Sequence, residues 1–231
     1  MYTLVRPVNS YTIVAGIIQR LAQMPLILLC RFFLRMEMRG VEHVRDLRSN
    51  VILAANHPHE IDPLVLVAAL PFAARHVPLI FVAKERKQYR HTGWRRYIYG
   101  GFFFKLLGAL PASVGVCDYE KALHYHIAAL QKGYSVCIFP MGRRHLTGDI
   151  EQAKGGVSFL TAHSGLPILP VRIIGLERMS YADFFLRRRK AVIVFGPPLY
   201  FTDISEARES NPNWTECERA AVRLMRKIMS L

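Results

Sequence analysis

The chain has 231 residues, of which 52% are hydrophobic, so it is long and apolar enough for one large α/β domain and is not disordered. Its formal net charge of +14 favours anionic partners, such as nucleic acid, anionic lipid head groups or a phosphorylated small molecule. The four cysteines are widely spaced without a CxxC pair, which argues against a zinc site and a disulfide framework and indicates a reducing compartment.

The first element is a strongly apolar stretch from residue 11 to residue 36 that Arg20, Pro25 and Arg31 interrupt. The interruptions argue against a clean transmembrane span, and the order of charges does not suit a signal peptide. We expect a pair of short helices lying in the membrane interface, with Arg20, Arg31 and Arg35 reaching the lipid head groups. The alternative is a helix buried in a soluble core.

Strands and helices alternate along the rest of the chain. The expected strands are 50–56, 77–84, 134–140, 166–175 and 191–199, and the expected helices are 63–70, 118–133, 154–165 and 215–231. This order predicts an α/β fold with a mixed, largely parallel sheet flanked by helices, preceded by the apolar helical segment at the membrane interface. We expect two parts, a membrane-associated segment (1–37) and an α/β domain (38–231), with the chemistry on loops at the carboxyl ends of strands.

The stretch AANHPHEIDP lies at such a strand end and allows several interpretations. His57 and His59 have the spacing of metal ligands on an extended chain, but no second cluster of histidines accompanies them, so we expect no metal. Asp62 directly precedes Pro63 and an apolar run, where a helix N-cap belongs. His57 alone would most simply be a core histidine bonded to the backbone.

A catalytic interpretation uses His57 and Asp62 together. A neutral imidazole takes a proton from a hydroxyl when a carboxylate holds its other nitrogen and stabilises the cation that forms. Five positions in a continuous helix turn through about 500°, so the two side chains meet only if the chain folds back before the helix starts. Pro58 and Pro63 favour such a broken entry.

The sequences NHPHEID (56–62) and FPMGRRH (139–145) together resemble the glycerolipid acyltransferase family, the lysophosphatidic acid acyltransferase-like enzymes with H-x4-D and F-P-E-G motifs. The likeness extends from about residue 38 to residue 200. It implies an O-acyltransferase in which the hydroxyl of a lysophospholipid-like acceptor, 1-acyl-glycerol-3-phosphate or a related lyso-lipid, attacks the thioester of acyl-CoA or acyl-carrier protein. The resemblance makes His57 the general base and Asp62 its orienting partner, and it implies no metal or other cofactor.

Further substrate-binding residues follow from the same motifs and from their places after strands: Lys84, Met141, Gly142, Arg143, Arg144 and Pro170. Two departures affect acceptor recognition. Met141 stands where the family has Glu, and a thioether makes none of a carboxylate's hydrogen bonds. The stretch 108–116 lacks the Arg that the family uses as a phosphate clamp, so Arg143 and Arg144 are the candidates to contact phosphate. Lys84 and the two arginines are alternatively solvated surface cations.

Two other segments suggest contact with lipid or an acidic protein. The stretch 94–108 mixes aromatic and basic residues and suits a membrane contact, an acyl tunnel or an ordinary amphipathic helix. The run RRRK (187–190) suits a solvated turn that touches lipid head groups or an acidic carrier protein. We expect a membrane-associated protein at the cytoplasmic face, partnered by an anionic membrane surface.

Two competing functions remain. The chain is alternatively a catalytically degenerate membrane-bound binder of lipid or acyl thioester, as Met141 suggests, although His57 and Asp62 are both present. The charge alone suggests a nucleic-acid binder, but no recognition motif accompanies it, so we expect no nucleic acid as a partner.

Overall fold

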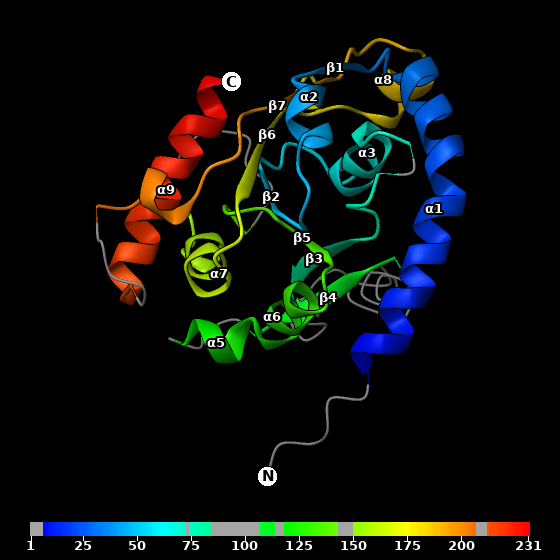
Figure 1. Cartoon of the computed structure of the whole chain (residues 1–231). Helices are drawn as coiled ribbons and strands as arrows, with labels where there is room; N and C mark the ends of the chain where they lie inside the picture. The colour runs from blue at the N-terminus through cyan, green and yellow to red at the C-terminus, as the bar shows by residue number, and fades with distance from the viewer. Residues whose placement is uncertain (1–6, 73, 85–106, 114–117, 143–149, 207–211) are drawn as a thin grey trace.

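The computed structural model describes residues 7–72, 74–84, 107–113, 118–142, 150–206 and 212–231. Within them, seven strands form one sheet in the order β1-β7-β6-β2-β5-β3-β4 (Figure 1). The strands are β1 (Glu37–Arg39), β2 (Ile52–Ala55), β3 (Leu79–Lys84), β4 (Ala109–Ala112), β5 (Ser135–Ile138), β6 (Ile168–Ile174) and β7 (Val192–Phe195).

Five neighbouring strands, β6-β2-β5-β3-β4, are parallel, whereas β7 runs antiparallel to β6 and pairs in parallel with β1. The predicted α/β fold with a mixed, largely parallel sheet is therefore confirmed. The short edge strands β1 and β4 were not predicted. Because β2, β3, β5 and β6 are parallel, their carboxyl ends lie along one edge of the sheet, where loops collect the functional residues.

Helices cover both faces of the sheet (Figure 1). They are α1 (Pro7–Phe33), α2 (Val41–Arg45), α3 (Asp62–Ala69), α5 (Tyr119–Ala122), α6 (His124–Gln131), α7 (Gly156–Ser164), α8 (Tyr181–Phe185) and α9 (Trp214–Ser230), with a 3-10 turn, η2, at Phe201–Asp203. Alternate residues of the buried strand β2 point to opposite faces: Leu53 joins the core under α1 and α3, and Ile52 joins the core under α6, α7 and α9.

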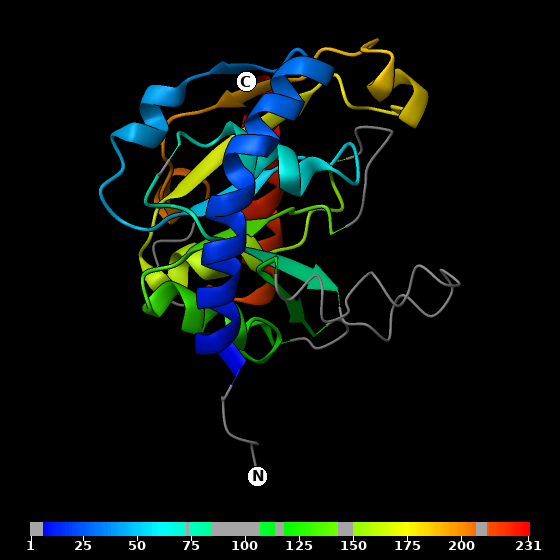
Figure 2. The ribbon, with the colours of Figure 1, turned by 90° about the vertical axis from the view of Figure 1, so that its right-hand side faces the viewer.

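The N-terminal segment is one helix, so the expected pair of short helices is wrong. Helix α1 continues through Pro25 and runs along the side of the molecule (Figure 2). One of its faces is buried and carries two glutamines that bind backbone groups of the domain. Gln19 Nε2 donates to Leu79 O at 2.8 Å and accepts through Oε1 from Leu79 N at 2.9 Å, and Gln23 Nε2 donates to Leu70 O at 3.1 Å. The inward face of α1 thus carries buried glutamines beside small apolar residues such as Ala15 and Cys30, while most of its large apolar side chains point outward.

Two further expectations need correction. The helix expected over 118–133 is divided at Leu123, whose φ of −114° and ψ of 15° separate α5 from α6. Arg20, expected to reach lipid head groups, instead donates through Nη2 to Val77 O at 3.0 Å, which holds its guanidinium against the domain. The remaining predicted strands and helices are present, with ends shifted by a few residues.

Candidate functional site

Asn56 fastens the chain where it leaves β2. Its Nδ2 donates to Ile173 O at 2.8 Å, and its Oδ1 accepts from Ile173 N at 2.7 Å. The side chain therefore imitates a backbone pair and extends the β2–β6 contact by one step beyond Ala55. Because both its hydrogen-bonding groups are used, Asn56 fixes the direction in which the next residue, His57, leaves the sheet.

His57 and Asp62 meet in the turn between β2 and α3. His57 Nδ1 lies 2.7 Å from Asp62 Oδ2, and the same oxygen accepts from His59 N at 2.9 Å. Asp62 is the first residue of α3, Ile61 holds the N-cap position, and no side chain caps this helix. The capping role considered for Asp62 is therefore wrong, because its carboxylate turns back to the loop rather than to the amides of its own helix.

The carboxylate of Asp62 is fully buried. Burial raises its pKa above the usual value, because removal from water penalises the charged form, while the hydrogen bond from His57 lowers it again. Its second oxygen, Oδ1, finds no hydrogen-bond partner in the described part of the chain. The two hydrogen bonds that stabilise the charged carboxylate, from His57 and from His59 N, are both made to Oδ2. The bond from His57 lowers the pKa of Asp62 most, so the ionised form of Asp62 depends on His57.

His57 is held between this carboxylate and an aromatic ring. Its imidazole stacks on Phe139 with centroids 4.2 Å apart and planes inclined by 18°, and 19% of its side chain is exposed. An ionised carboxylate only accepts hydrogen bonds, so Nδ1 carries the proton that is shared with Asp62 and Nε2 carries the lone pair. No hydrogen bond to Nε2 comes from the described residues, so this nitrogen is open to a proton from a bound hydroxyl.

His59 and Glu60 bind the loop that follows β6. His59 Nδ1 accepts from Ile61 N at 3.4 Å and its Nε2 donates to Met179 O at 3.1 Å, while Tyr181 Oη donates to Glu60 Oε1 at 2.8 Å. Both ring nitrogens of His59 are therefore engaged with backbone atoms. This arrangement leaves His59 no lone pair for a metal ion and gives it a positioning role in the loop.

Lys84, Met141 and Gly142 lie at or after the carboxyl ends of β3 and β5, on the sheet edge that carries His57. Lys84 ends β3, is exposed, and is separated from β2 by the intervening strand β5. Gly142 makes a turn with φ of +62° and donates to Phe139 O at 2.9 Å. Met141, just before it, is 5% exposed and packs in the apolar cluster that includes Ile138. Its thioether thus belongs to the core.

Pro170 lies within β6 opposite Ala54, buried, with its carbonyl accepting from Gly196 N at 2.9 Å. It is therefore part of the sheet below the site rather than of its rim. Arg143, Arg144 and most of the stretch 94–108 lie outside the described residues. The substrate-binding roles assigned to Lys84, Met141, Gly142, Arg143, Arg144 and Pro170 stay predictions.

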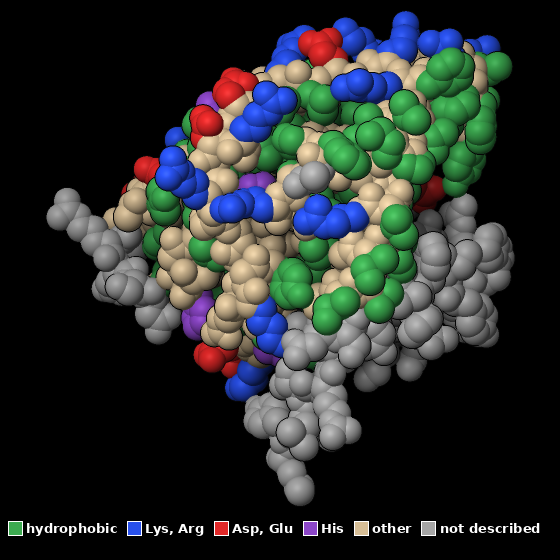
Figure 3. All heavy atoms as spheres, turned by 45° about the vertical axis from the view of Figure 1, so that its right-hand side comes forward, with side chains coloured by type: hydrophobic (Ala, Val, Ile, Leu, Met, Phe, Trp, Pro, Cys, Tyr) green, Lys and Arg blue, Asp and Glu red, His purple; other side chains and the backbone are tan. Residues whose placement is uncertain are grey.

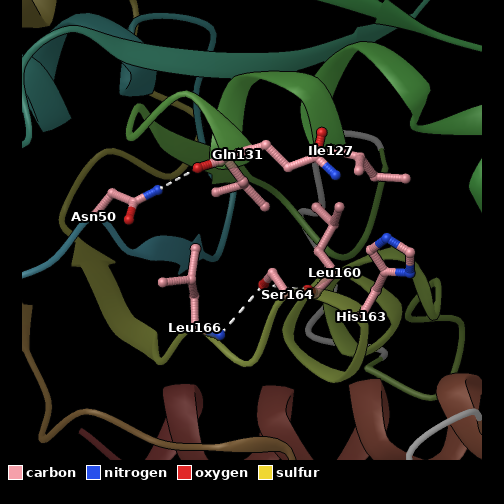
Figure 4. A pocket seen from close by; sticks show the side chains of 8 residues that line it. Asn50, Ile127, Gln131, Leu160, His163, Ser164 and Leu166 are labelled. Carbon is pink, nitrogen blue, oxygen red and sulfur yellow. Dashed lines mark hydrogen bonds between the residues drawn. The ribbon is translucent and has the colours of Figure 1, made fainter.

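A pocket of about 260 Å³ lies at the opposite edge of the sheet (Figure 4). Asn50 precedes β2 and Leu166 precedes β6, whereas His57 follows the carboxyl end of β2, so this pocket is remote from the His57–Asp62 pair. Ser164 and Gln131 border it at the ends of α7 and α6. Asn50 Nδ2 already donates to Leu130 O at 2.9 Å there, and we assign this pocket no part in the chemistry.

Sequence reasoning missed the residues that support the pair. Asn56 stood directly before His57, and its place at the end of a buried strand was the one available signal for its role. Phe139, Met179 and Tyr181 approach the site from distant parts of the chain, about 80 to 120 residues away from His57–Glu60. No local pattern links them, because these contacts arise from the order of strands in the sheet.

Comparisons with known proteins identify the family of the chain. A family model described as Acyltransferase matches residues 35–174. The chain is similar to two proteins named "Probable 1-acyl-sn-glycerol-3-phosphate acyltransferase". The one from Mycoplasma pneumoniae is 25% identical over 72% of this chain and 64% of its own length. The one from Mycoplasma genitalium is 30% identical over 54% of this chain and 44% of its own length. The chain thus spans less than two thirds of the length of these relatives.

A human protein, "1-acyl-sn-glycerol-3-phosphate acyltransferase beta", is 24% identical over 68% of this chain and 51% of its own length. The crystal structure of the 1-acyl-sn-glycerophosphate (LPA) acyltransferase PlsC from Thermotoga maritima superposes with a TM-score of 0.58 at 18% identity. It covers 99% of this chain and 85% of that chain, and therefore shares its fold. Because the family model spans more than half of the 231 residues and includes both His57 and Asp62, the chain belongs to the Acyltransferase family.

Proposed function

We propose that the protein transfers a fatty acyl group from acyl-CoA or acyl-carrier protein to the hydroxyl of a lysophospholipid-like acceptor, such as 1-acyl-glycerol-3-phosphate. The observation that carries the proposal is the 2.7 Å contact between His57 Nδ1 and a fully buried Asp62, with His57 Nε2 facing away from the pair. The names of the related proteins support this acceptor class.

The reaction needs one proton to move twice. His57 Nε2 takes the proton of the acceptor hydroxyl as its oxygen attacks the thioester carbonyl carbon, and Asp62 stabilises the imidazolium that forms. The C–S bond then breaks, the sulfur leaves, and the imidazolium returns the proton to give a free thiol and an ester. The protein's groups supply both proton transfers, so the scheme requires no metal or redox cofactor.

Substrate binding in this proposal uses the residues at the same sheet edge. Lys84 and the turn at Gly142, followed by Arg143 and Arg144, supply cations and backbone groups to phosphate. In this proposal Met141 and Pro170 do not contact the substrate. They pack in the core and in β6 and support the loops that bind it. Acyl donor and acceptor are both anionic, which suits a chain with a formal net charge of +14.

The proposal also places the protein on the cytoplasmic face of an anionic membrane. Among the described residues, the 22-residue stretch Thr12–Phe33 of α1 is long and apolar enough to cross a bilayer by length and composition. Its buried glutamines bind the domain, however, so a position along the membrane interface fits better than a span. In this proposal, residues 1–37 serve membrane contact and 38–231 serve the chemistry.

The test measures thiol release from acyl-CoA by the full chain on vesicles that carry lysophosphatidate. We expect release that depends on the acceptor and is abolished in His57→Ala. The control is His163→Ala, an exposed histidine at the remote pocket, which should keep turnover. Binding of acyl-CoA without turnover across a panel of lyso-lipids and with both donor types would instead establish the binding-protein alternative that Met141 suggests.

A further inference from the structure

Helix α8 and the C-terminal half of α1 form one exposed apolar surface. Six large apolar side chains, each between 45% and 64% exposed, define this α1–α8 surface: Leu28, Leu29, Phe32, Tyr181, Phe185 and Leu186. Figure 3 shows hydrophobic side chains gathered on this face, with Lys and Arg side chains along its upper edge. A contiguous patch of this kind on a protein surface marks an interaction site.

The exposed side chains of α8 are held in place by packing against α1. Phe184 stacks on Phe33 with centroids 4.9 Å apart, and Arg187 donates through Nε to Phe32 O at 2.9 Å while its guanidinium lies 4.3 Å above the Phe32 ring. Ser180 and Asp183 form a capping box at the start of α8. These contacts fix α8 on α1 with the side chains of Phe185 and Leu186 exposed.

The border of the α1–α8 surface is basic. Its exposed cations that pair with no acidic side chain of the described residues are Arg31, Arg35, Arg178, Arg187 and Arg188. The acidic groups nearby are engaged: Asp183 lies 3.6 Å from Arg189, Glu37 lies 2.6 Å from Lys190, and Glu177 accepts from Gly175 N at 2.9 Å. An apolar centre with a basic rim complements a bilayer that carries anionic head groups, because the apolar side chains enter the interface and the cations meet phosphate.

The exposed apolar side chains of α1 extend well beyond the α1–α8 surface, and this length favours lipid over a protein partner. Exposed apolar residues continue along α1 from Ile13 to Phe32, a distance of about 28 Å at the rise of an α-helix. A bilayer covers such an extended stripe without a shaped complementary surface, whereas an acidic carrier protein would need one. Because the buried glutamines of α1 face the domain, the large apolar side chains on its other face stay exposed among the described residues.

We propose that α8 is a second membrane-contact element, which together with α1 docks the protein on an anionic lipid bilayer and sets the orientation of the His57 loop. The link is direct, because Tyr181 in α8 donates to Glu60 at 2.8 Å and Met179 just before α8 accepts from His59 at 3.1 Å. The docked helix and the loop that carries His57 are therefore held together. The orienting part of this proposal rests on the proposed function, whereas the docking part does not.

The docking test compares the full chain with the double variant Phe185→Glu/Leu186→Glu by sedimentation with phosphatidylcholine vesicles, with and without phosphatidylglycerol. We expect the double variant to lose at least about tenfold in affinity for the anionic vesicles, since two large apolar side chains no longer enter the interface and two carboxylates repel the anionic lipid. The matched control is Tyr200→Glu, which places a charge on a residue that is 53% exposed near the opposite sheet edge and should bind as the wild type does. Unchanged thermal unfolding of all variants shows that each is folded.

Vesicle binding by the double variant equal to that of the wild type would overturn the docking proposal. So would a loss confined to binding of acyl-carrier protein or to self-association, because α8 would then face a protein. These measurements contain no substrate, so they give an answer even if the chain transfers no acyl group.

The orienting test uses Tyr181→Phe, which removes the hydroxyl that binds Glu60 but keeps the aromatic ring. We expect unchanged vesicle binding with turnover of vesicle-borne lysophosphatidate lowered about threefold, the loss of one exposed hydrogen bond. Turnover of a short-chain, water-soluble acceptor should be less affected. Equal effects on both acceptors, or none on either, would overturn the link between α8 and the His57 loop.

Discussion

His57 Nδ1 and Asp62 Oδ2 lie 2.7 Å apart, with His57 in the turn after β2 and Asp62 at the first position of α3. The chain folds back over Pro58 and His59 before α3 starts, and His59 N donates to the same carboxylate oxygen at 2.9 Å. The turn thus delivers two hydrogen bonds to one buried oxygen. This geometry shows that Asp62 does not cap α3, and it gives His57 the carboxylate-bound imidazole that the proposed general base requires.

Replacement of Asp62 by Asn should reduce turnover about 10²- to 10⁴-fold, the usual contribution of general acid–base catalysis. The amide oxygen of Asn still accepts from His57 Nδ1, but it carries no charge to stabilise the imidazolium. Thiol release under saturating donor and acceptor measures the effect. The control is Asp118→Asn, whose carboxylate caps α5 and pairs with Lys121 at the surface. Turnover of the Asp62 variant near the wild-type value would refute the role of the pair.

Removal of the imidazole in His57→Ala should destabilise the protein by about 1–3 kcal/mol near neutral pH, because a buried carboxylate loses a hydrogen-bond donor. The pKa of Asp62, already raised by burial, should rise further. Between about 4, the ordinary pKa of Asp, and that raised pKa, the folded state binds more protons than the unfolded chain, so the variant's stability falls as pH rises.

The destabilisation of His57→Ala is therefore largest above the folded-state pKa of Asp62 and shrinks as the pH falls below about 4, where the carboxyl is neutral in both states. Denaturant unfolding of the variant and the wild type across this pH range measures the difference. His163→Ala serves as the control, since its exposed side chain should give no such pH dependence. A difference that stays constant with pH would show that Asp62 is not the group responsible.

Asn56 and Asn50 provide a matched pair at the two ends of β2. Each side chain makes two hydrogen bonds to backbone atoms, Asn56 to Ile173 and Asn50 to Leu130 and Tyr134. We expect both alanine variants to lose about 1–3 kcal/mol of unfolding free energy. Only Asn56→Ala should also lose turnover, because it alone releases the chain that leads to His57. Equal turnover in the two variants would mean that Asn56 serves stability alone.

The two faces of α1 should respond differently to truncation. Gln19→Ala leaves Leu79 N and O without their partner and should cost about 2–4 kcal/mol of unfolding free energy in the absence of lipid. Leu21→Ala, at a side chain that is 74% exposed, should change that free energy by less than about 0.5 kcal/mol. Vesicle binding should respond in the opposite way, because Leu21→Ala should weaken binding to vesicles more than Gln19→Ala does. A large stability loss in Leu21→Ala would mean that its apolar face packs against protein.

The local sequence pattern was sufficient to predict most of the helices and strands. Buried strands such as β2 appear as short apolar runs, and Gly165, with φ of +69°, ends α7 as expected of a glycine after the last helical residue. The candidate pair could also be predicted, because Pro58 and Pro63 favour a break in the chain between His57 and α3 that lets the two side chains meet. These features depend on a few neighbouring residues, which is why they can be read from the chain alone.

The sequence by itself determined the alternation of strands and helices, the place of His57 and Asp62 at a strand end, and the basic, apolar character of the chain. The tertiary structure alone decided that Asp62 turns back instead of capping α3, that α1 places its glutamines inward, and that α8 lies against the loop of His59 and Glu60. The reason is physical: each of these outcomes depends on hydrogen bonds between groups brought together by the sheet, and the direction of a side chain follows from partners that its own neighbours do not reveal.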